Sequence, residues 1–198
     1  ALAREGAVEA ICVPSRGVAR EDHERAVVAA LLGRSIDIVC LAGYMRVLGQ
    51  AFIAGLSRPI LNVHPSLLPA FPGMHAQRQA LEAGVRWSGA TVHFVDTGLD
   101  TGPIILQQLV RVEPDDTEAS LSTRILETEH RLYPRALDVV ALTDHDTVAG
   151  CPRFRESLAP EHRAALVHEA LRLDGGEQIG LLQQIHAVRQ QAFADDEP

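Results

Sequence analysis

The loop-forming stretch 61–73 constrains the fold of this chain more than any other part of its sequence. It follows the short strand-like run 58–61, and three prolines then fall within eight residues, at Pro65, Pro69 and Pro72. Proline lacks a backbone N–H and breaks both helix interiors and central strands. The chain must therefore leave its strand here and continue as an ordered loop.

Two polar side chains, Asn62 and His64, stand where this strand gives way to the loop. At the two-residue period of a strand they point to the same side. An amide that can donate, beside a ring that can carry a proton near neutral pH, suits a site that handles a carbonyl oxygen. A packed histidine and a turn-forming asparagine are the commoner structural roles, so this pair alone leaves both interpretations open.

Length and composition indicate one soluble globular domain. The chain has 198 residues, 46% of them hydrophobic and 22% charged, with a formal net charge of −8 that gives no support to a nucleic-acid or anionic-membrane partner. Its apolar runs are shorter than a bilayer span. The three cysteines, Cys12, Cys40 and Cys151, show no metal-ligand spacing and are expected as small hydrophobes in a reducing, cytoplasmic compartment.

Hydrophobic periodicity predicts alternating strands and helices. The expected strands are 8–13, 36–42, 60–63, 91–95 and 104–112, and the expected helices are 21–32, 51–56, 76–83 and 117–142. This order predicts an α/β fold with a doubly wound, mostly parallel sheet, in which 91–95 and 104–112 form a hairpin. The catalytic domain would span 1–150, and 151–198 would form a helical extension with helices at 161–171 and 178–192.

The longest expected helix, 117–142, has one apolar face and contains Pro134, which we expect to kink it. The expected face consists of Leu121, Ile125, Leu132, Ala136 and either Val139 or Val140.

Ligands of such sheets bind beyond the carboxyl ends of the strands, which brings the loops 43–48, 62–73 and 96–102 together. Asp100 lies between two glycines of the last loop. It is either a turn residue that satisfies its own backbone, or a carboxylate that points inward, pairs with His64, fixes the tautomer of the ring and favours the imidazolium.

An asparagine, a histidine and an aspartate without an exposed nucleophile suit attack on a carbonyl by an amine that the substrate supplies. Asn62 and a protonated His64 would stabilise the oxyanion, and His64 would then pass a proton to the leaving nitrogen. Ser66 has no GxSxG context, so a serine triad is disfavoured. The histidines show no metal-binding spacing, and the sequence has no Walker loop and no GxGxxG.

Several motifs, in order along the chain, are similar to those of one family. They are LAGYMRVL at 41–48, NVHPSLLP with FPG at 62–73, HAQRQAL at 75–81, SGATVHFV at 88–95, GLDTGP at 98–103 and EHRLYP at 129–134. These motifs resemble the formyltetrahydrofolate-dependent formyltransferases, over about residues 5 to 150. Within that family the match is best to the members that formylate glycinamide ribonucleotide in purine synthesis.

The resemblance implies a Rossmann-like fold and transfer of a formyl group from 10-formyltetrahydrofolate to the amine of glycinamide ribonucleotide, without a metal or a covalent adduct. It implies His64 as general acid, Asn62 as ligand of the formyl oxygen and Asp100 as the carboxylate partner of His64. It also implies folate contacts by Arg20, Met45, Arg46, Val47, Leu48, Asn62 and Val95, and a ribose contact by Glu129.

Three alternatives stay open beside this activity. They are hydrolysis of the formyl folate, formylation of transfer RNA, which the acidic charge disfavours, and folate binding without catalysis. The family begins with a strand and a phosphate-holding Gly-Ser-Asn loop that this sequence lacks, so we expect either an N-terminally truncated copy or that the missing part lies in another segment. We expect small-molecule partners, and a homodimer is left open.

Overall fold

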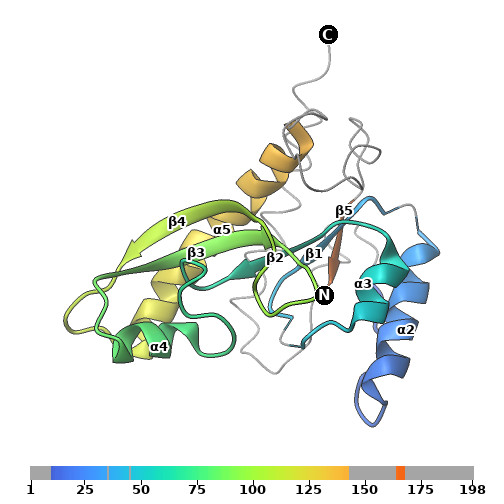
Figure 1. The fold of residues 1–198 in the computed structure, drawn as a ribbon, viewed down its shortest axis with the longest axis horizontal. Coiled ribbons are helices and arrows are strands. Elements are labelled where there is room, and N and C mark those ends of the chain that lie inside the picture. Colours follow the sequence, from blue (N-terminus) through green and yellow to red (C-terminus); the bar gives the residue numbers. More distant parts are fainter. Residues whose placement is uncertain (1–9, 35, 45, 143–163, 168–198) are drawn as a thin grey trace.

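The computed structural model describes residues 10–142, except 35 and 45, and residues 164–167. The helices are α2 (Arg20–Leu32), α3 (Gln50–Leu56), α4 (Ala76–Glu82) and α5 (Glu118–Leu142), and the strands are β1 (Ile38–Leu41), β2 (Ile60–His64), β3 (Trp87–Phe94), β4 (Ile104–Arg111) and β5 (Ala164–Val167) (Figure 1). Helices and strands alternate along the chain from α2 to β3. The α/β class expected from the sequence is therefore confirmed.

Among the residues that the structure describes, the sheet has five strands in the order β4-β3-β2-β1-β5. β1 pairs in parallel with β2 and β5, while β3 is antiparallel to both of its neighbours, β2 and β4. Four strands therefore run in one direction and only β3 is reversed, so the sheet is mostly parallel in direction but mixed in its pairing. The expected hairpin between 91–95 and 104–112 is confirmed as β3 and β4, with β3 beginning earlier, at Trp87.

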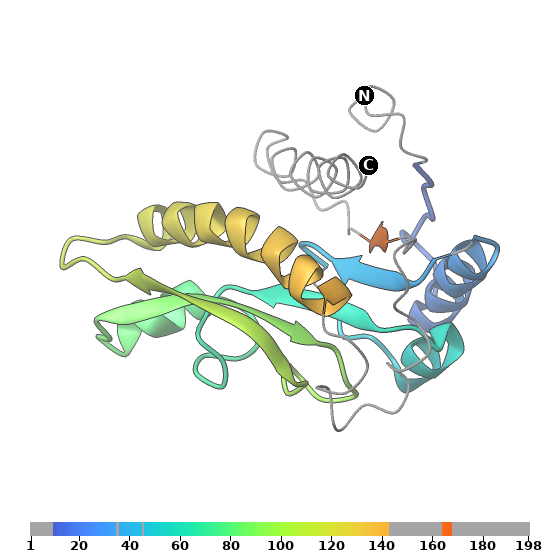
Figure 2. The same cartoon turned by 90° about the horizontal axis from the view of Figure 1, so that it is seen from above.

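Helices cover both faces of the sheet. α5 lies along one face of the sheet. α2 and α3 lie together at one end of the molecule, where they pack against the other face of β1 and β2 (Figures 1 and 2). β1 is buried throughout and contributes Ile38 and Cys40 to the core under α5, but Val39 and Leu41 to the core under α2 and α3. This division explains why the segment has apolar residues at consecutive positions, since both of its faces are covered.

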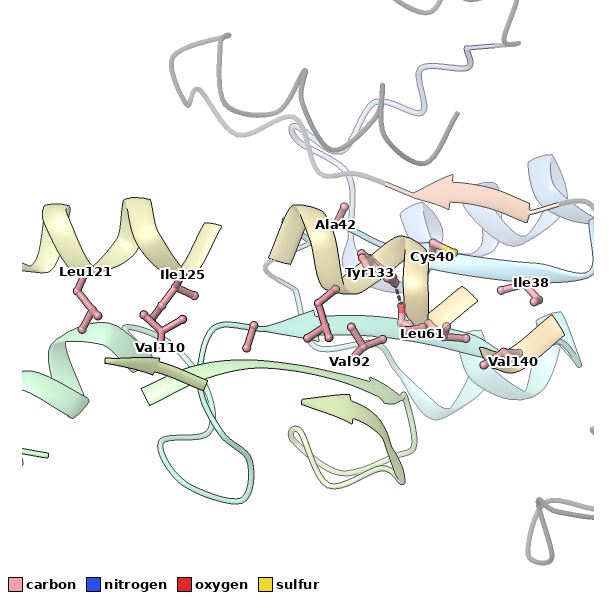
Figure 3. Packing of buried hydrophobic residues seen from close by; sticks show 13 residues of the cluster. Ile38, Cys40, Ala42, Leu61, Val92, Val110, Leu121, Ile125, Tyr133 and Val140 are labelled. Atoms are coloured by element: carbon pink, nitrogen blue, oxygen red, sulfur yellow. Dashed lines mark hydrogen bonds between the residues drawn. The ribbon is translucent and has the colours of Figure 1, made fainter. Parts of the chain in front are cut away.

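Tyr133 on α5 contacts the backbone of two neighbouring strands, β1 and β2. Its side chain is fully buried, and its hydroxyl lies 2.9 Å from the carbonyl oxygens of both Leu41 and Leu61. Figure 3 shows the contact with Leu61. The last residue of β1 is thereby held beside the residue that precedes Asn62. The expected apolar face of α5 is confirmed, with Val140 rather than Val139 in the core.

Two sequence-based expectations are wrong. Residues 10–13 are not a strand, and Cys12 is exposed rather than buried. Residues 164–167, expected within a helix, form β5, because the open edge of β1 supplies the N–H and C=O partners that a strand requires. Tertiary pairing overrides the helical pattern there. Cys151 and the rest of 151–198 lie outside the described residues.

Cys40 behaves as expected. It is fully buried, and burial raises the pKa of its thiol to about 12. Cys40 is therefore a neutral core side chain at physiological pH.

Candidate active site

Asn62 and His64 lie on the sheet face opposite α5. Val63, which lies between them, packs against the core under α5, to which Leu61 belongs, whereas Ile60 belongs to the core under α2 and α3. Because strand side chains alternate, Asn62 and His64 share the side of Ile60. The same-side arrangement expected from the sequence follows directly from this packing.

Both ring nitrogens of His64 face oxygen atoms. Nε2 lies 2.8 Å from the carbonyl oxygen of Phe71, and Nδ1 lies 3.4 Å from Oδ2 of Asp100. The His64 side chain is only 6% exposed and that of Asp100 only 12% exposed, so water screens the pair weakly. A neutral imidazole has a single N–H, whereas the imidazolium can donate to both oxygens. The ring is therefore flanked by an oxygen acceptor on each side.

Asp100 points inward and connects two loops. In addition to facing His64, its Oδ2 accepts a 2.7 Å hydrogen bond from the backbone N–H of Gly73. The sequence left open that Asp100 is a turn residue. In the structure it is Asp96 that stabilises the turn, because its Oδ1 accepts a hydrogen bond from the N–H of Gly98 at 2.9 Å. Asp100 has a left-handed φ of 53°, a conformation in which aspartate is enriched. The loops 62–73 and 96–102 therefore meet at this carboxylate.

His93 is a member of this cluster that the sequence analysis did not select. The β2–β3 register pairs it with Asn62, and its Nε2 lies 3.4 Å from the amide nitrogen of Asn62 and 3.8 Å from Oδ1 of Asp100. Nδ1 lies 2.9 Å from the carbonyl oxygen of Phe94, so Nδ1 carries the proton. The pKa of His93 is lowered, because burial of the ring outweighs the nearby carboxylates. A neutral Nε2 can then accept a hydrogen bond from Asn62.

The proline-rich loop is fastened to the sheet through Thr91. The Thr91 hydroxyl donates to the carbonyl of Ser66 at 2.6 Å and accepts from the N–H of Leu68 at 3.0 Å. Gln107 on β4 donates to the Leu68 carbonyl at 2.9 Å. The hydroxyl of Ser66 itself donates to the carbonyl of Ala70, so Ser66 braces the loop and does not face His64 as a nucleophile.

The residues expected to contact folate lie on α2, beyond the end of β1, on β2 and directly after β3. Leu48 and Val95 pack in one apolar cluster with Leu41. Val47 is 57% exposed, Arg46 is half-buried, and Met45 lies outside the described residues. Arg20, at the start of α2, forms an ion pair with Glu24. Their roles as folate contacts stay predictions.

Glu129 lies on α5, one turn before Tyr133. Its side chain is partly buried, and burial raises the pKa of the carboxyl to about 8. At neutral pH this group is therefore largely protonated and can donate a hydrogen bond.

The raised pKa of Glu129 predicts a decline in stability with rising pH. In the unfolded chain the carboxyl ionises near pH 4.5, while the folded chain keeps its proton up to about pH 8. This group's contribution is thus most favourable below pH 4.5 and is lost between those values. At pH 8 we expect Glu129→Gln to have a free energy of unfolding higher than that of the native chain by on the order of a few kcal/mol, and therefore a higher melting temperature. At pH 4 the two chains should be equally stable. Thermal unfolding followed by circular dichroism at both pH values tests this, and equal melting temperatures at pH 8 would contradict it.

Within the described residues, no group of three or more His, Cys, Asp or Glu side chains could hold a metal ion. The described helices also include none that is long and apolar enough to cross a membrane.

Comparison with known families decides the assignment of this fold. A family model described as formyl transferase matches residues 2–137. This chain belongs to the formyl transferase family. The resemblance inferred from the motifs at 41–48, 62–73 and 98–103 is thereby confirmed.

Two curated members of the formyl transferase family illustrate the similarity. The chain is 51% identical over 118 residues to the trifunctional purine biosynthetic protein adenosine-3 of Drosophila melanogaster, a match that covers 60% of this chain and 9% of that protein. It is 44% identical over 114 residues to the phosphoribosylglycinamide formyltransferase of Bacillus subtilis (strain 168), covering 58% of each. The chain thus spans less than two thirds of either relative.

Solved formyl transferase structures share the fold. Phosphoribosylglycinamide formyltransferase from Streptococcus pneumoniae TIGR4 superposes with a TM-score of 0.65 at 40% identity, covering 70% of this chain and 77% of that one. Glycinamide ribonucleotide transformylase 1 from Symbiobacterium toebii superposes with a TM-score of 0.64 at 50% identity, covering 68% and 64% respectively.

Proposed function

We propose that this chain takes part in the transfer of a formyl group from 10-formyltetrahydrofolate to the amine of glycinamide ribonucleotide. One observation carries the proposal: His64 lies between the Phe71 carbonyl and the Asp100 carboxylate, on the same sheet face as Asn62. The names of relatives that share 44% to 51% identity with the chain support the choice of substrates.

The reaction needs charge stabilisation and movement of a proton. The substrate amine attacks the formyl carbon, a C–N bond forms, and the carbonyl electron pair moves onto oxygen. Collapse of this tetrahedral intermediate breaks the bond to the folate nitrogen, which takes a proton as the attacking amine loses one. The amide N–H of Asn62 and the N–H of His64 are suited to stabilise the oxyanion. His64 is suited to deliver the proton.

Asp100 determines which nitrogen of His64 faces the substrate. It lies on the Nδ1 side of the ring, so the Nε2–H is the donor available to a formyl oxygen. This N–H points to the Phe71 carbonyl. Donation to the substrate therefore requires the formyl oxygen to replace Phe71 as acceptor.

Placement of the two substrates follows the sequence-based prediction. We assign the formyl folate to Arg20, Met45, Arg46, Val47, Leu48, Asn62 and Val95, and the ribose of the amine substrate to Glu129. A protonated Glu129 can donate to a ribose oxygen, and its raised pKa supports this role.

The deciding experiment supplies the protein with 10-formyltetrahydrofolate, with and without glycinamide ribonucleotide, and measures both formate and the formamide product. We expect loss of the formyl group only when the ribonucleotide is present. Formate released at the same rate in its absence would establish a hydrolase instead. Folate binding without either product would establish a binding module.

His93 is expected to act through Asn62 rather than on the substrate. Replacing His93 with leucine removes the acceptor of the Asn62 amide, so the amide loses its fixed orientation. We expect kcat to fall about 10-fold to 100-fold, since one oxyanion donor is misplaced, with both KM values little changed. Steady-state kinetics with each substrate varied in turn tests this, with Asn62→Ala as the reference for complete loss of the donor. An unchanged kcat in a folded His93→Leu variant would show that Asn62 needs no such partner.

A further inference from the structure

Glu24 is a buried carboxylate on a helix whose other acidic residues are exposed. It is 5% exposed, whereas Glu21 and Asp22 in the same turn of α2 face solvent. Burying a carboxylate is costly unless specific partners compensate it. Glu24 has two such partners, and both belong to the region that we assign to the formyl folate.

The first partner is the backbone of the segment that ends at Gly49. Oε1 of Glu24 accepts a 3.1 Å hydrogen bond from the N–H of Gly49, which is the residue before α3. Gly49 directly follows Arg46, Val47 and Leu48. The carboxylate therefore fixes the end of this segment, although the two positions are 25 residues apart in sequence.

The second partner is Arg20, one turn earlier on α2. Its Nε lies 3.5 Å from Oε1 of Glu24, and its side chain is 55% exposed. The ion pair restrains the base of the arginine side chain and leaves the exposed part free to meet a ligand. One carboxylate oxygen thus restrains both Arg20 and the 46–48 segment.

Close packing of α2 against α3 leaves little room for Glu24 to move. A Cβ atom at Gly49 would lie 2.6 Å from Oε2 of Glu24, and one at Gly55 would lie 3.5 Å from Val28, one turn further along α2. The two helices lie side by side in both views of the molecule (Figures 1 and 2). A side chain at position 49 would displace the carboxylate.

We infer that Glu24 is a positioning residue for the formyl-donor site, which holds Arg20 and the 46–49 backbone in the arrangement that binds the folate. This inference rests on the proposed function. It predicts that substitutions of Glu24 weaken the binding of the formyl donor and leave the binding of the amine substrate unchanged, because Glu24 contacts neither His64 nor Glu129. A residue that only stabilised the fold would affect both substrates alike.

The test uses Glu24→Ala, which removes both contacts, and Glu24→Gln, which keeps an oxygen acceptor for Gly49 but loses the charge that pairs with Arg20. Glu21→Ala, on the exposed side of the same turn, is the matched control. Binding of 10-formyltetrahydrofolate is measured by calorimetry, and KM is measured for each substrate. Exchange of the Gly49 amide proton is followed by NMR.

We expect Glu24→Ala to raise Kd and KM for 10-formyltetrahydrofolate about 10-fold, in line with the loss of a charge-assisted hydrogen bond, with kcat and the KM of the amine within about twofold. Glu24→Gln should fall between Glu24→Ala and the native protein and should keep the Gly49 amide protected. Equal rises in both KM values, or no rise in a folded variant, would overturn the inference. If Glu24→Ala does not fold, the folded Glu24→Gln variant decides alone. Failure of the native protein to bind the folate would refute the proposed function itself.

Discussion

Replacing His64 with alanine is expected to lower kcat about a thousandfold, because it removes both an oxyanion donor and the proton donor of the proposed reaction. The ring makes no large contribution to the apolar core, so the folate should still bind. Formamide production at saturating concentrations of both substrates measures kcat, and calorimetry with 10-formyltetrahydrofolate measures the retained binding. A folded His64→Ala variant with kcat within about tenfold of the native value would remove His64 from the mechanism.

Two further variants separate chemistry from structure in this prediction. Asp100→Asn keeps an oxygen that can accept from the Gly73 N–H, and asparagine tolerates the left-handed φ of 53°, so the loops should stay joined while the negative charge beside His64 is lost. We expect its kcat to fall about 10-fold to 100-fold. His75→Asn is the control: His75 is exposed, also has a left-handed φ, of 58°, and has no contact with His64 or Asp100 among those of the structure.

Replacing Gly102 with alanine is expected to destabilise the protein by about 3 kcal/mol or more, since overpacking against backbone cannot be relieved by rotation of a side chain. A Cβ atom at Gly102 would lie 1.8 Å from the carbonyl oxygen of Phe94. The adjacent Pro103 carbonyl accepts the Phe94 N–H at 2.9 Å, so the clash would also separate the ends of β3 and β4. Asp100, two residues away, would move with them. Denaturant unfolding measures the stability, and the formyl-transfer assay reports on the displaced carboxylate.

Gly33→Ala is the matched control for this substitution. Gly33 has a φ of −67°, and the nearest atom to an added Cβ would be the Ala29 carbonyl oxygen at 3.6 Å, which is ordinary contact. We expect its stability to stay within about 1 kcal/mol of the native value. A Gly102→Ala variant as stable as Gly33→Ala would show that the β3–β4 connection can shift without cost.

The local sequence was informative where a residue's role depends on its immediate neighbours. Alternation along β2 placed Asn62 and His64 on one side, and the three prolines predicted the loop after them. Asp100 was identified as a candidate, but its two possible roles could be separated only by the structure. Its contact with Gly73 joins residues that are 27 apart in sequence.

Other residues could not be found in this way because their partners lie far along the chain. His93 faces Asn62 only through the β2–β3 register, and its sequence context is that of any alternating strand. Glu24 was not selected either, because its partner Gly49 lies 25 residues further along the chain, just before α3. The strand at 164–167 likewise depends on the edge of β1, which supplies its hydrogen bonds.

The amino-acid sequence by itself determined the order of the strands and helices from α2 to α5, the break after β2 and the family to which the chain belongs. These features follow from local periodicity, from the fixed φ of proline and from motifs that are contiguous along the chain. Only the tertiary structure decided which polar groups meet: His64 with Asp100, Asn62 with His93, and Glu24 with Gly49. The physical reason is that such contacts depend on strand register and helix packing, which the burial of the whole core selects and no single segment specifies.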